Sequence, residues 1–196
     1  MLTKDQLLKP ISLHRKDAVV ITTMGVVRPW GNYSQSELDF ASADSAMGHA
    51  ADLALGIALA QPRRKVICLN GDGSMLMTLG TLVTIIHSGA RNLILFVIQN
   101  DTYEITGNQP VPGASLTDYV TLARGAGFTK AHSFSRAEEY SACLPELLCE
   151  EGPVFISVRV GPGFEKPLSR GENEKVMYLR PSLAESAHRL RQVLSA

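Results

Sequence analysis

The segment best suited to chemistry is Asn70-Gly71-Asp72-Gly73-Ser74, which joins a carboxylate to two glycines and a hydroxyl. It follows an apolar run at 65–70 that predicts a strand, and it leads into helical spacing at 74–88. Glycines let the backbone approach a bound group closely, and N–H groups at the start of a helix attract anions. Asp72 repels a bare phosphate, but Mg²⁺ can bridge its carboxylate to diphosphate oxygens. The segment therefore predicts a site for a diphosphate and a metal ion.

Two other phosphate-binding motifs do not fit this segment. A dinucleotide-binding turn needs a third glycine where this chain has Leu76, and an acid about 20 residues further on, where it has Arg91 and Asn92. The P-loop needs Gly-Lys-Ser or Gly-Lys-Thr, and the sequence contains neither. Asp and Gly are also common turn residues, so Gly-Asp-Gly alone leaves an ordinary turn as an alternative.

The next apolar run supplies a second oxygen donor. This run, 92–99, predicts a strand and ends at Asn100, 28 positions after Asp72. A strand, a crossover helix and a parallel strand together need about 30 residues, which fits that spacing. Adjacent parallel strands would bring the two side chains to the same sheet edge, where carboxylate and amide oxygens suit Mg²⁺.

The elements that must position these residues alternate along the chain. Strands are predicted at 17–23, 65–70, 92–99, 128–133 and 153–160, and helices at 47–60, 74–88, 117–126, 135–150 and 182–194. Ser135 with Glu138, and Ser182 with Glu185, predict capping boxes at the last two helices. This order predicts an α/β fold, an open and mostly parallel sheet with helices on both faces. Residues 161–175 are expected to form a surface arm.

Composition limits the class of protein. The 196 residues are 45% apolar and 19% charged, which is typical of one globular domain. Lys plus Arg equals Asp plus Glu at 19 each, which disfavours nucleic acid and anionic membranes as partners. Neither a secretory signal nor a run of about 18 apolar residues occurs, so a cytoplasmic protein is expected. The three cysteines lack any Cys-x-x-Cys pair and are expected to be buried free thiols.

Gly71-Asp72-Gly73-Ser74 followed by an apolar strand ending in Asn100 resembles the motif of thiamine-diphosphate enzymes. The resemblance implies that Asp72, the Asn100 side chain and the Thr102 carbonyl bind Mg²⁺. It also implies that backbone N–H groups near Gly73, Ser74 and Tyr103 hold the diphosphate, with Gly71 beside it. The likeness covers about 17–160 and is consistent with the α/β prediction. Residues 1–160 are thus expected to form the thiamine-diphosphate and magnesium domain, with 161–196 as an arm and helix packed on it.

Ser45-Ala46-Met47-Gly48-His49 resembles the family segment that meets the cofactor rings. By that likeness Met47 holds the cofactor in its bent shape, and the Ser45 carbonyl accepts a bond from the aminopyrimidine. Without the family match, Met47 would be interpreted as a core methionine.

The chain is most similar to sulfopyruvate and phosphonopyruvate decarboxylases, which also have a Gly-x-Gln stretch like Gly107-Asn108-Gln109-Pro110. It departs from the family in having Gln99 beside Asn100 in place of paired asparagines. Ala46 stands where Ser is common, and Asp101 and Thr102 replace smaller residues.

Enzymes of this family also need a pyrimidine-binding domain with an activating glutamate, for which this chain has no room. The resemblance therefore implies a separate alpha-type subunit, in an alpha2beta2 assembly or with a homodimer of this chain. The implied reaction is decarboxylation of a small 2-oxo acid, with the cofactor as electron sink and release of an aldehyde. Candidates for the anionic end of the substrate are Arg28, His49, Asn108 and Gln109, although His49 also suits helix capping and Arg28 a solvated loop.

Two alternatives stay open at this point. One keeps the cofactor and joins the intermediate to a second carbonyl compound, as in relatives of acetolactate synthase. The other is a non-catalytic α/β module that binds an anion or nucleotide and never meets thiamine diphosphate.

Overall fold

The computed structural model describes residues 1–44 and 47–195 of the chain. Within these residues six strands form one sheet in the order β2-β1-β3-β4-β8-β7, and every neighbouring pair is parallel. The predicted open α/β sheet is confirmed. The strands of this sheet are β1 Val19–Thr23, β2 Asp39–Ser42, β3 Val66–Gly71, β4 Leu93–Gln99, β7 Lys130–Phe134 and β8 Val154–Arg159.

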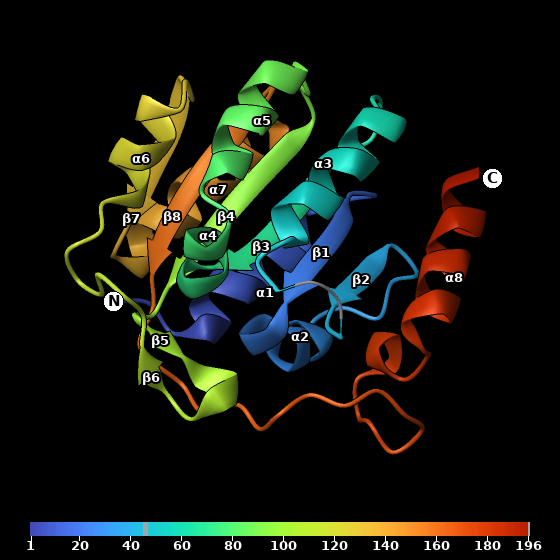
Figure 1. Ribbon diagram of the computed structural model, residues 1–196. Helices are drawn as coiled ribbons and strands as arrows, with labels where there is room; N and C mark the ends of the chain where they lie inside the picture. Colours follow the sequence, from blue (N-terminus) through green and yellow to red (C-terminus); the bar gives the residue numbers. More distant parts are fainter. Residues whose placement is uncertain (45–46, 196) are drawn as a thin grey trace.

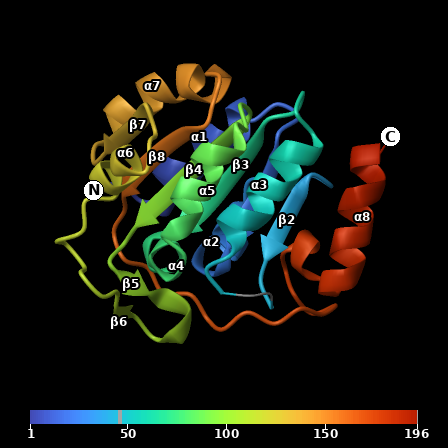
Figure 2. The same cartoon turned by 45° about the horizontal axis from the view of Figure 1, so that its top comes forward.

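Helices cover both faces of the sheet (Figures 1 and 2). One layer contains α3 Ala50–Ala60, α4 Asp72–Met77, α5 Gly80–Ser88 and α6 Tyr119–Gly125. The opposite layer contains α1 Lys4–His14, α2 Met24–Gly31 and α7 Ala137–Cys149. The last helix, α8 Leu183–Ser195, lies beside edge strand β2.

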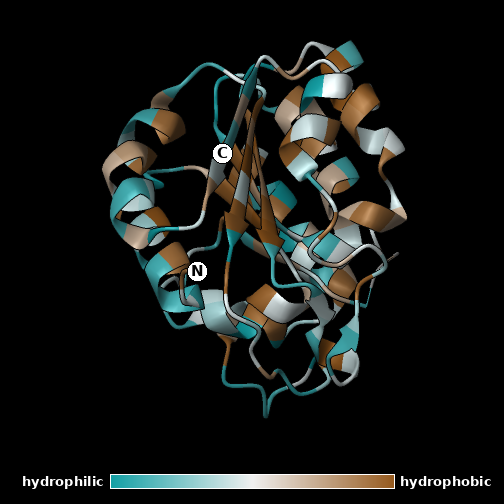
Figure 3. Cartoon of the chain, turned by 90° about the vertical axis from the view of Figure 1, so that its left-hand side faces the viewer, coloured by the Kyte–Doolittle hydropathy of each residue, from teal (hydrophilic) through white to brown (hydrophobic). Residues whose placement is uncertain are grey.

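The central strands are apolar on both sides because each face packs on helices (Figure 3). In β4, alternate residues enter different cores: Leu93, Leu95 and Val97 join the α3, α5 and α6 side. Ile94, Phe96 and Ile98 join the α1, α2 and α7 side. A shift of one residue would exchange the two sets, so this packing fixes the register that aligns the strand ends.

Two predicted helices begin or break differently from the sequence pattern. The helix expected at 47–60 begins at Ala50, because Gly48 adopts a left-handed φ of +85° that a helix cannot include. The helix expected at 74–88 is divided into α4 and α5. The break follows Thr78, whose hydroxyl donates to the Gly48 carbonyl at 2.6 Å and whose backbone leaves helical geometry.

The two predicted capping boxes have different outcomes. The box at α8 is confirmed: Glu185 N donates to the Ser182 hydroxyl at 3.2 Å, and Ser182 N donates to the Glu185 carboxylate at 2.8 Å. The box at α7 is wrong. That helix begins after Arg136 without a side-chain cap, so Ser135 lies one position too early.

Several elements were not predicted. The first helix, α1, begins with a capping box of Thr3 and Gln6, and α2 follows β1 directly. Strand β2 forms one sheet edge, where Asp39 makes a buried ion pair with Arg15. A small antiparallel hairpin of β5 Thr102–Tyr103 and β6 Gln109–Pro110 encloses the 3₁₀ helix η1 Glu104–Thr106.

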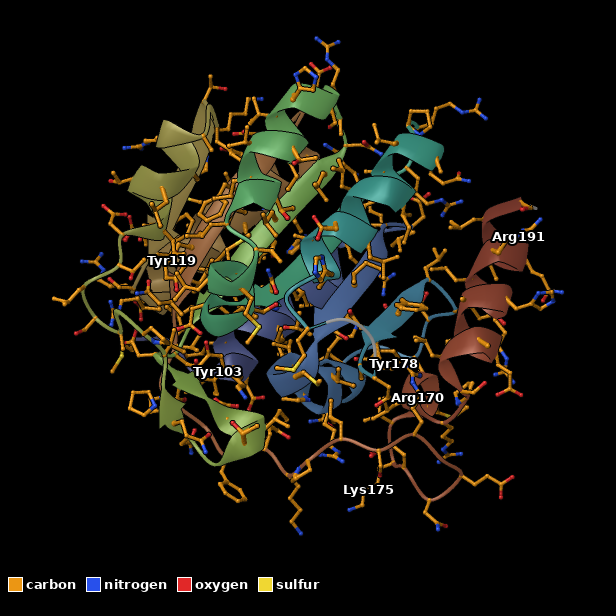
Figure 4. The ribbon with its side chains drawn as sticks, in the orientation of Figure 1. Tyr103, Tyr119, Arg170, Lys175, Tyr178 and Arg191 are labelled. Carbon is orange, nitrogen blue, oxygen red and sulfur yellow. The ribbon has the colours of Figure 1, made fainter. Side chains whose placement is uncertain are left out.

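The segment after β8 runs without helix or strand from 161 to 176 and then forms the short η2 Met177–Leu179. Arg170 fastens it beside β2 by donating to the carbonyls of Ala41 at 2.8 Å and Pro181 at 3.0 Å (Figure 4). Tyr178 donates to the Val27 carbonyl at 2.7 Å. These contacts attach the arm to the strands and helices that precede it, while the domain boundary at 160 stays a prediction.

The cysteines differ in exposure. Cys68 is buried in β3 as expected, and burial raises the pKa of its thiol. Cys143 is half-buried and Cys149 is exposed, so the expectation of buried thiols is wrong for Cys149, which ends α7 on the solvent side. All three are free. No helix in the described part of the chain combines the length and apolar character needed to cross a membrane.

The contact between α2 and the arm leads to a stability prediction. A Cβ at Gly31 would lie 2.4 Å from Cγ1 of buried Val176. Gly31→Ala should therefore lower the free energy of unfolding by about 1–3 kcal/mol through overpacking. Gly56→Ala, in the open interior of α3, meets nothing within 4 Å and should raise it by about 0.5–1 kcal/mol. Urea unfolding measures both, and equal effects would contradict the packing argument.

Candidate functional site

A cavity lies beyond the carboxyl ends of β3 and β4, where α/β sheets bind ligands. The two strands are paired up to Gly71 and Ile98, so the loops that follow them emerge side by side. Eight of the residues expected to bind the cofactor line this cavity: Met47, Gly71, Asp72, Gly73, Ser74, Asn100, Thr102 and Tyr103. The ninth, Ser45, lies outside the described residues.

The Asp72 carboxylate is 2% exposed and is held by backbone N–H groups from both strand ends. Oδ1 accepts from Gly73 N at 2.8 Å, and Oδ2 accepts from Asn100 N at 3.0 Å and Asp101 N at 2.7 Å. Burial raises the pKa of this carboxyl group, and the three N–H groups only partly oppose that shift. No ion pair to Asp72 occurs within residues 1–44 and 47–195. A buried carboxylate that accepts from backbone N–H groups but has no cationic partner is suited to bind a metal ion.

The loop after β4 presents Asn100 and Thr102 to the same cavity. Asn100 Oδ1 accepts from Thr102 N at 3.2 Å, and Asn100 Nδ2 donates to Glu104 Oε1 at 2.8 Å. Asp101 makes the turn possible with a φ of +62°, a conformation that Asp tolerates better than most residues. Its carboxylate binds Arg159 Nη2 at 2.7 Å. The left-handed φ and the ion pair with Arg159 explain why Asp stands at position 101 instead of a smaller residue.

The position of the Tyr103 ring leaves no space for a side chain at Gly73. A Cβ at Gly73 would lie 2.3 Å from Cε1 of Tyr103, a distance that atoms do not adopt. Tyr103 belongs to β5, and its ring lies next to α4 (Figure 4). Gly73 N already donates to Asp72 Oδ1 at 2.8 Å, and half-buried Ser74 follows it in the cavity wall. Such a backbone can contact a diphosphate.

Met47 lines the same cavity and is 58% exposed. The alternative of a core methionine is therefore wrong. The following residue, Gly48, has a left-handed φ, and a Cβ there would come within 2.8 Å of Met77 Cβ. The sequence Met47-Gly48 thus places a flexible, exposed apolar side chain in the cavity wall.

The four candidates for substrate contact do not line the cavity. Arg28 binds Glu174 at 3.0 Å and the Lys166 carbonyl at 2.7 Å, which fastens the arm. Asn108 also holds the arm, because its Nδ2 donates to the Gly163 carbonyl at 3.0 Å. His49 pairs with Asp52 at the start of α3, and exposed Gln109 accepts from Thr106 at 2.5 Å. Their contact with a substrate stays a prediction.

Sequence reasoning missed two charged residues that line the cavity. Glu104 is buried and forms an ion pair with Lys4, which also donates to the Gly25 carbonyl at 2.8 Å. Nothing in the local sequence signals this pair, because Lys4 belongs to the polar start of α1 and Glu104 to a short 3₁₀ turn. Only the fold brings these distant residues together.

Comparison with known proteins places this geometry in a family. The model described as the C-terminal TPP binding domain of thiamine pyrophosphate enzymes matches residues 22–158. The chain is 39% identical over 117 residues to the sulfopyruvate decarboxylase subunit beta of Methanothermobacter thermautotrophicus, covering 60% of each chain. It is 34% identical over 125 residues to phosphonopyruvate decarboxylase of Streptomyces viridochromogenes, covering 64% of this chain and 31% of the relative. The chain thus spans between 31% and 60% of the length of these curated relatives.

Solved structures share the fold. Benzoylformate decarboxylase from Polynucleobacter necessarius superposes with a TM-score of 0.65 at 22% identity, covering 83% of this chain and 33% of that one. A 2-oxoglutarate:ferredoxin oxidoreductase chain from Magnetococcus marinus gives 0.66 at 13% identity, covering 98% and 84%. With the sequence match extending over most of the sheet, the chain belongs to the thiamine pyrophosphate enzymes and contains their C-terminal TPP binding domain.

Proposed function

We propose that this chain binds thiamine diphosphate with Mg²⁺ and acts as one subunit of a decarboxylase for a small, anionic 2-oxo acid. The observation that carries the proposal is the Asp72 carboxylate, which is buried beside the cavity with backbone N–H partners and no cationic partner described. The activities for which the decarboxylase relatives are named support the choice of reaction. A cytoplasmic location is proposed with it.

The donor set fits the proposed metal. Asp72 contributes a carboxylate oxygen, Asn100 an amide oxygen and Thr102 a backbone carbonyl, all hard ligands of the kind that Mg²⁺ prefers. The set contains one acid only, which agrees with the absence of any cluster of three His, Cys, Asp or Glu side chains in the described ranges. The Asp72 charge is then compensated by the metal, and the diphosphate neutralises the second positive charge.

The other residues position the organic part of the cofactor. Backbone N–H groups near Gly73, Ser74 and Tyr103 bind diphosphate oxygens. Gly73 N also donates to Asp72 Oδ1 at 2.8 Å, and the Tyr103 ring packs over Gly73. Met47 packs against the rings, and Gly71 leaves space beside the diphosphate. When bound, thiamine diphosphate supplies the nucleophilic carbon and electron sink for breaking a carbon–carbon bond next to a carbonyl.

A second chain is proposed to complete the site. The carboxylates lining the described cavity belong to Asp72 and Glu104, and both already accept several hydrogen bonds. The activating glutamate is therefore assigned to an alpha-type pyrimidine-domain subunit, in an alpha2beta2 assembly. Met47 and Met77, 58% and 45% exposed at the cavity, give that subunit an apolar contact. The relatives named as beta subunits support this division.

Binding of the cofactor tests the proposal. Calorimetric titration of thiamine diphosphate with Mg²⁺ should give metal-dependent binding to the chain, alone or with a candidate alpha-type subunit. Asp72→Ala should reduce affinity by more than about 100-fold, because it removes the charged metal ligand. Asp101→Asn is the matched control, since its carboxylate faces Arg159 and does not line the cavity.

The same preparation identifies the reaction. With sulfopyruvate or phosphonopyruvate, equal amounts of CO₂ and aldehyde support decarboxylation, whereas a ligated product would support carboligation. An absence of cofactor binding, even with the partner present, would overturn the proposal in favour of a plain anion-binding module.

The buried carboxylate also predicts a pH dependence. Burial raises the Asp72 pKa above its ordinary 3.8. The carboxyl group of Asp72 therefore holds its proton more tightly in the folded chain than in the unfolded chain. The stability of the wild type relative to Asp72→Asn should therefore fall as the pH rises through the raised pKa. Urea unfolding between about pH 4 and 8 measures this difference.

Saturating Mg²⁺ and thiamine diphosphate should reduce the loss of folding stability at higher pH in the wild type, and they should leave the stability of Asp72→Asn unchanged. A stability difference that is independent of pH, with and without cofactor, would contradict the role of the Asp72 charge.

A further inference from the structure

Glu104 is a buried acid that joins four segments of the chain at the cavity. Its Oε1 accepts from Asn100 Nδ2 at 2.8 Å and from Gly163 N at 2.7 Å. Its Oε2 accepts from the Lys4 ammonium group, which also donates to the Gly25 carbonyl at 2.8 Å. All of these partners are donors, so the site requires the ionised carboxylate.

These contacts allow only one orientation of the Asn100 amide. A carboxylate can only accept and a backbone N–H can only donate. Nδ2 must therefore face Glu104, and Oδ1 must face Thr102 N at 3.2 Å. The opposite orientation would bring the amide oxygen against a carboxylate and the NH₂ group against an N–H. Glu104, together with Thr102 N, thus leaves Oδ1 as the atom of Asn100 that can use its second lone pair to bind a cation.

The carboxylate itself is held in place from both sides. A Cβ at Gly25 would lie 3.3 Å from Glu104 Oε2, and a Cβ at Gly163 would lie 3.2 Å from Oε1. Two glycines therefore allow the backbone of α2 and of the arm to approach the acid closely. The Glu104 side chain is 1% exposed and that of Lys4 is 15% exposed, so water hardly competes for these hydrogen bonds.

We propose that Glu104, with its charge balanced by Lys4, is a positioning residue that orients Asn100 so that its Oδ1 is presented to Mg²⁺. The inference rests on the proposed function, because it concerns the same metal site. Groups that orient metal ligands commonly change metal affinity by about 10-fold to 100-fold when they are replaced. Glu104 itself does not bind the metal or the substrate.

The test is the Mg²⁺ affinity at saturating thiamine diphosphate, measured by calorimetry on the chain with its partner subunit. Glu104→Gln should weaken Mg²⁺ binding by at least about 10-fold, because one amide cannot accept from all three donors. Glu165→Gln is the matched control. It removes an acid whose carboxylate is 3.9 Å from Lys4 Nζ without touching Asn100, and it should leave the affinity unchanged.

A double variant that exchanges the amide of Asn100 with the carboxylate of Glu104 distinguishes the orientation of residue 100 from general structural support. Asn100→Asp should weaken Mg²⁺ binding, since two carboxylates then face each other. Adding Glu104→Gln should recover part of that loss, because the new amide can donate to the new carboxylate while its oxygen still accepts from Lys4, although Gly163 N then loses its acceptor. Circular dichroism and melting temperatures establish that each variant is folded.

Weaker binding in the single variants with recovery in the double variant supports the inference. A Glu104→Gln variant that melts at a lower temperature but binds Mg²⁺ like the wild type overturns it and leaves the proposed function intact, as does a double variant that binds no better than Asn100→Asp. A wild type that binds no Mg²⁺ and cofactor overturns both.

Discussion

Three backbone N–H groups, on Gly73, Asn100 and Asp101, converge on the Asp72 carboxylate and join the ends of β3 and β4. This interaction shapes the loop after β4, because the left-handed Asp101 can donate to Asp72 only if the chain turns back at that point. The turn then carries Tyr103 over Gly73. One buried acid therefore organises both walls of the proposed diphosphate site, while burial leaves its negative charge poorly compensated.

The sheet makes this convergence possible. Alternate residues of β4 enter two separate cores, so neither β3 nor β4 can shift along the other without exposing apolar side chains. Their carboxyl ends are consequently fixed at the same level. Thr78 adds a further constraint, because it ends α4 and its hydroxyl holds the carbonyl of Gly48, the residue next to exposed Met47 in the cavity wall.

The Lys4–Glu104 pair connects this edge to distant parts of the chain. Through it the start of α1, the start of α2 and the arm all contact the residue that orients Asn100. Arg28 contacts the arm by a different route, through Glu174 and the Lys166 carbonyl. The proposed metal site is thus supported by segments that lie far from the Gly-Asp-Gly motif in the sequence.

Local sequence determined the parallel α/β sheet, its five predicted strands and the positions of Asp72 and Asn100, because buried strands and strand-end loops leave periodic, short-range patterns. It did not determine edge strand β2, the break at Thr78, the exposure of Met47 or the partners of Arg28. Tertiary structure alone decided these features and the pairing of Lys4 with Glu104. Each depends on contacts between residues far apart in the chain, for which hydrophobic periodicity and turn chemistry carry no signal.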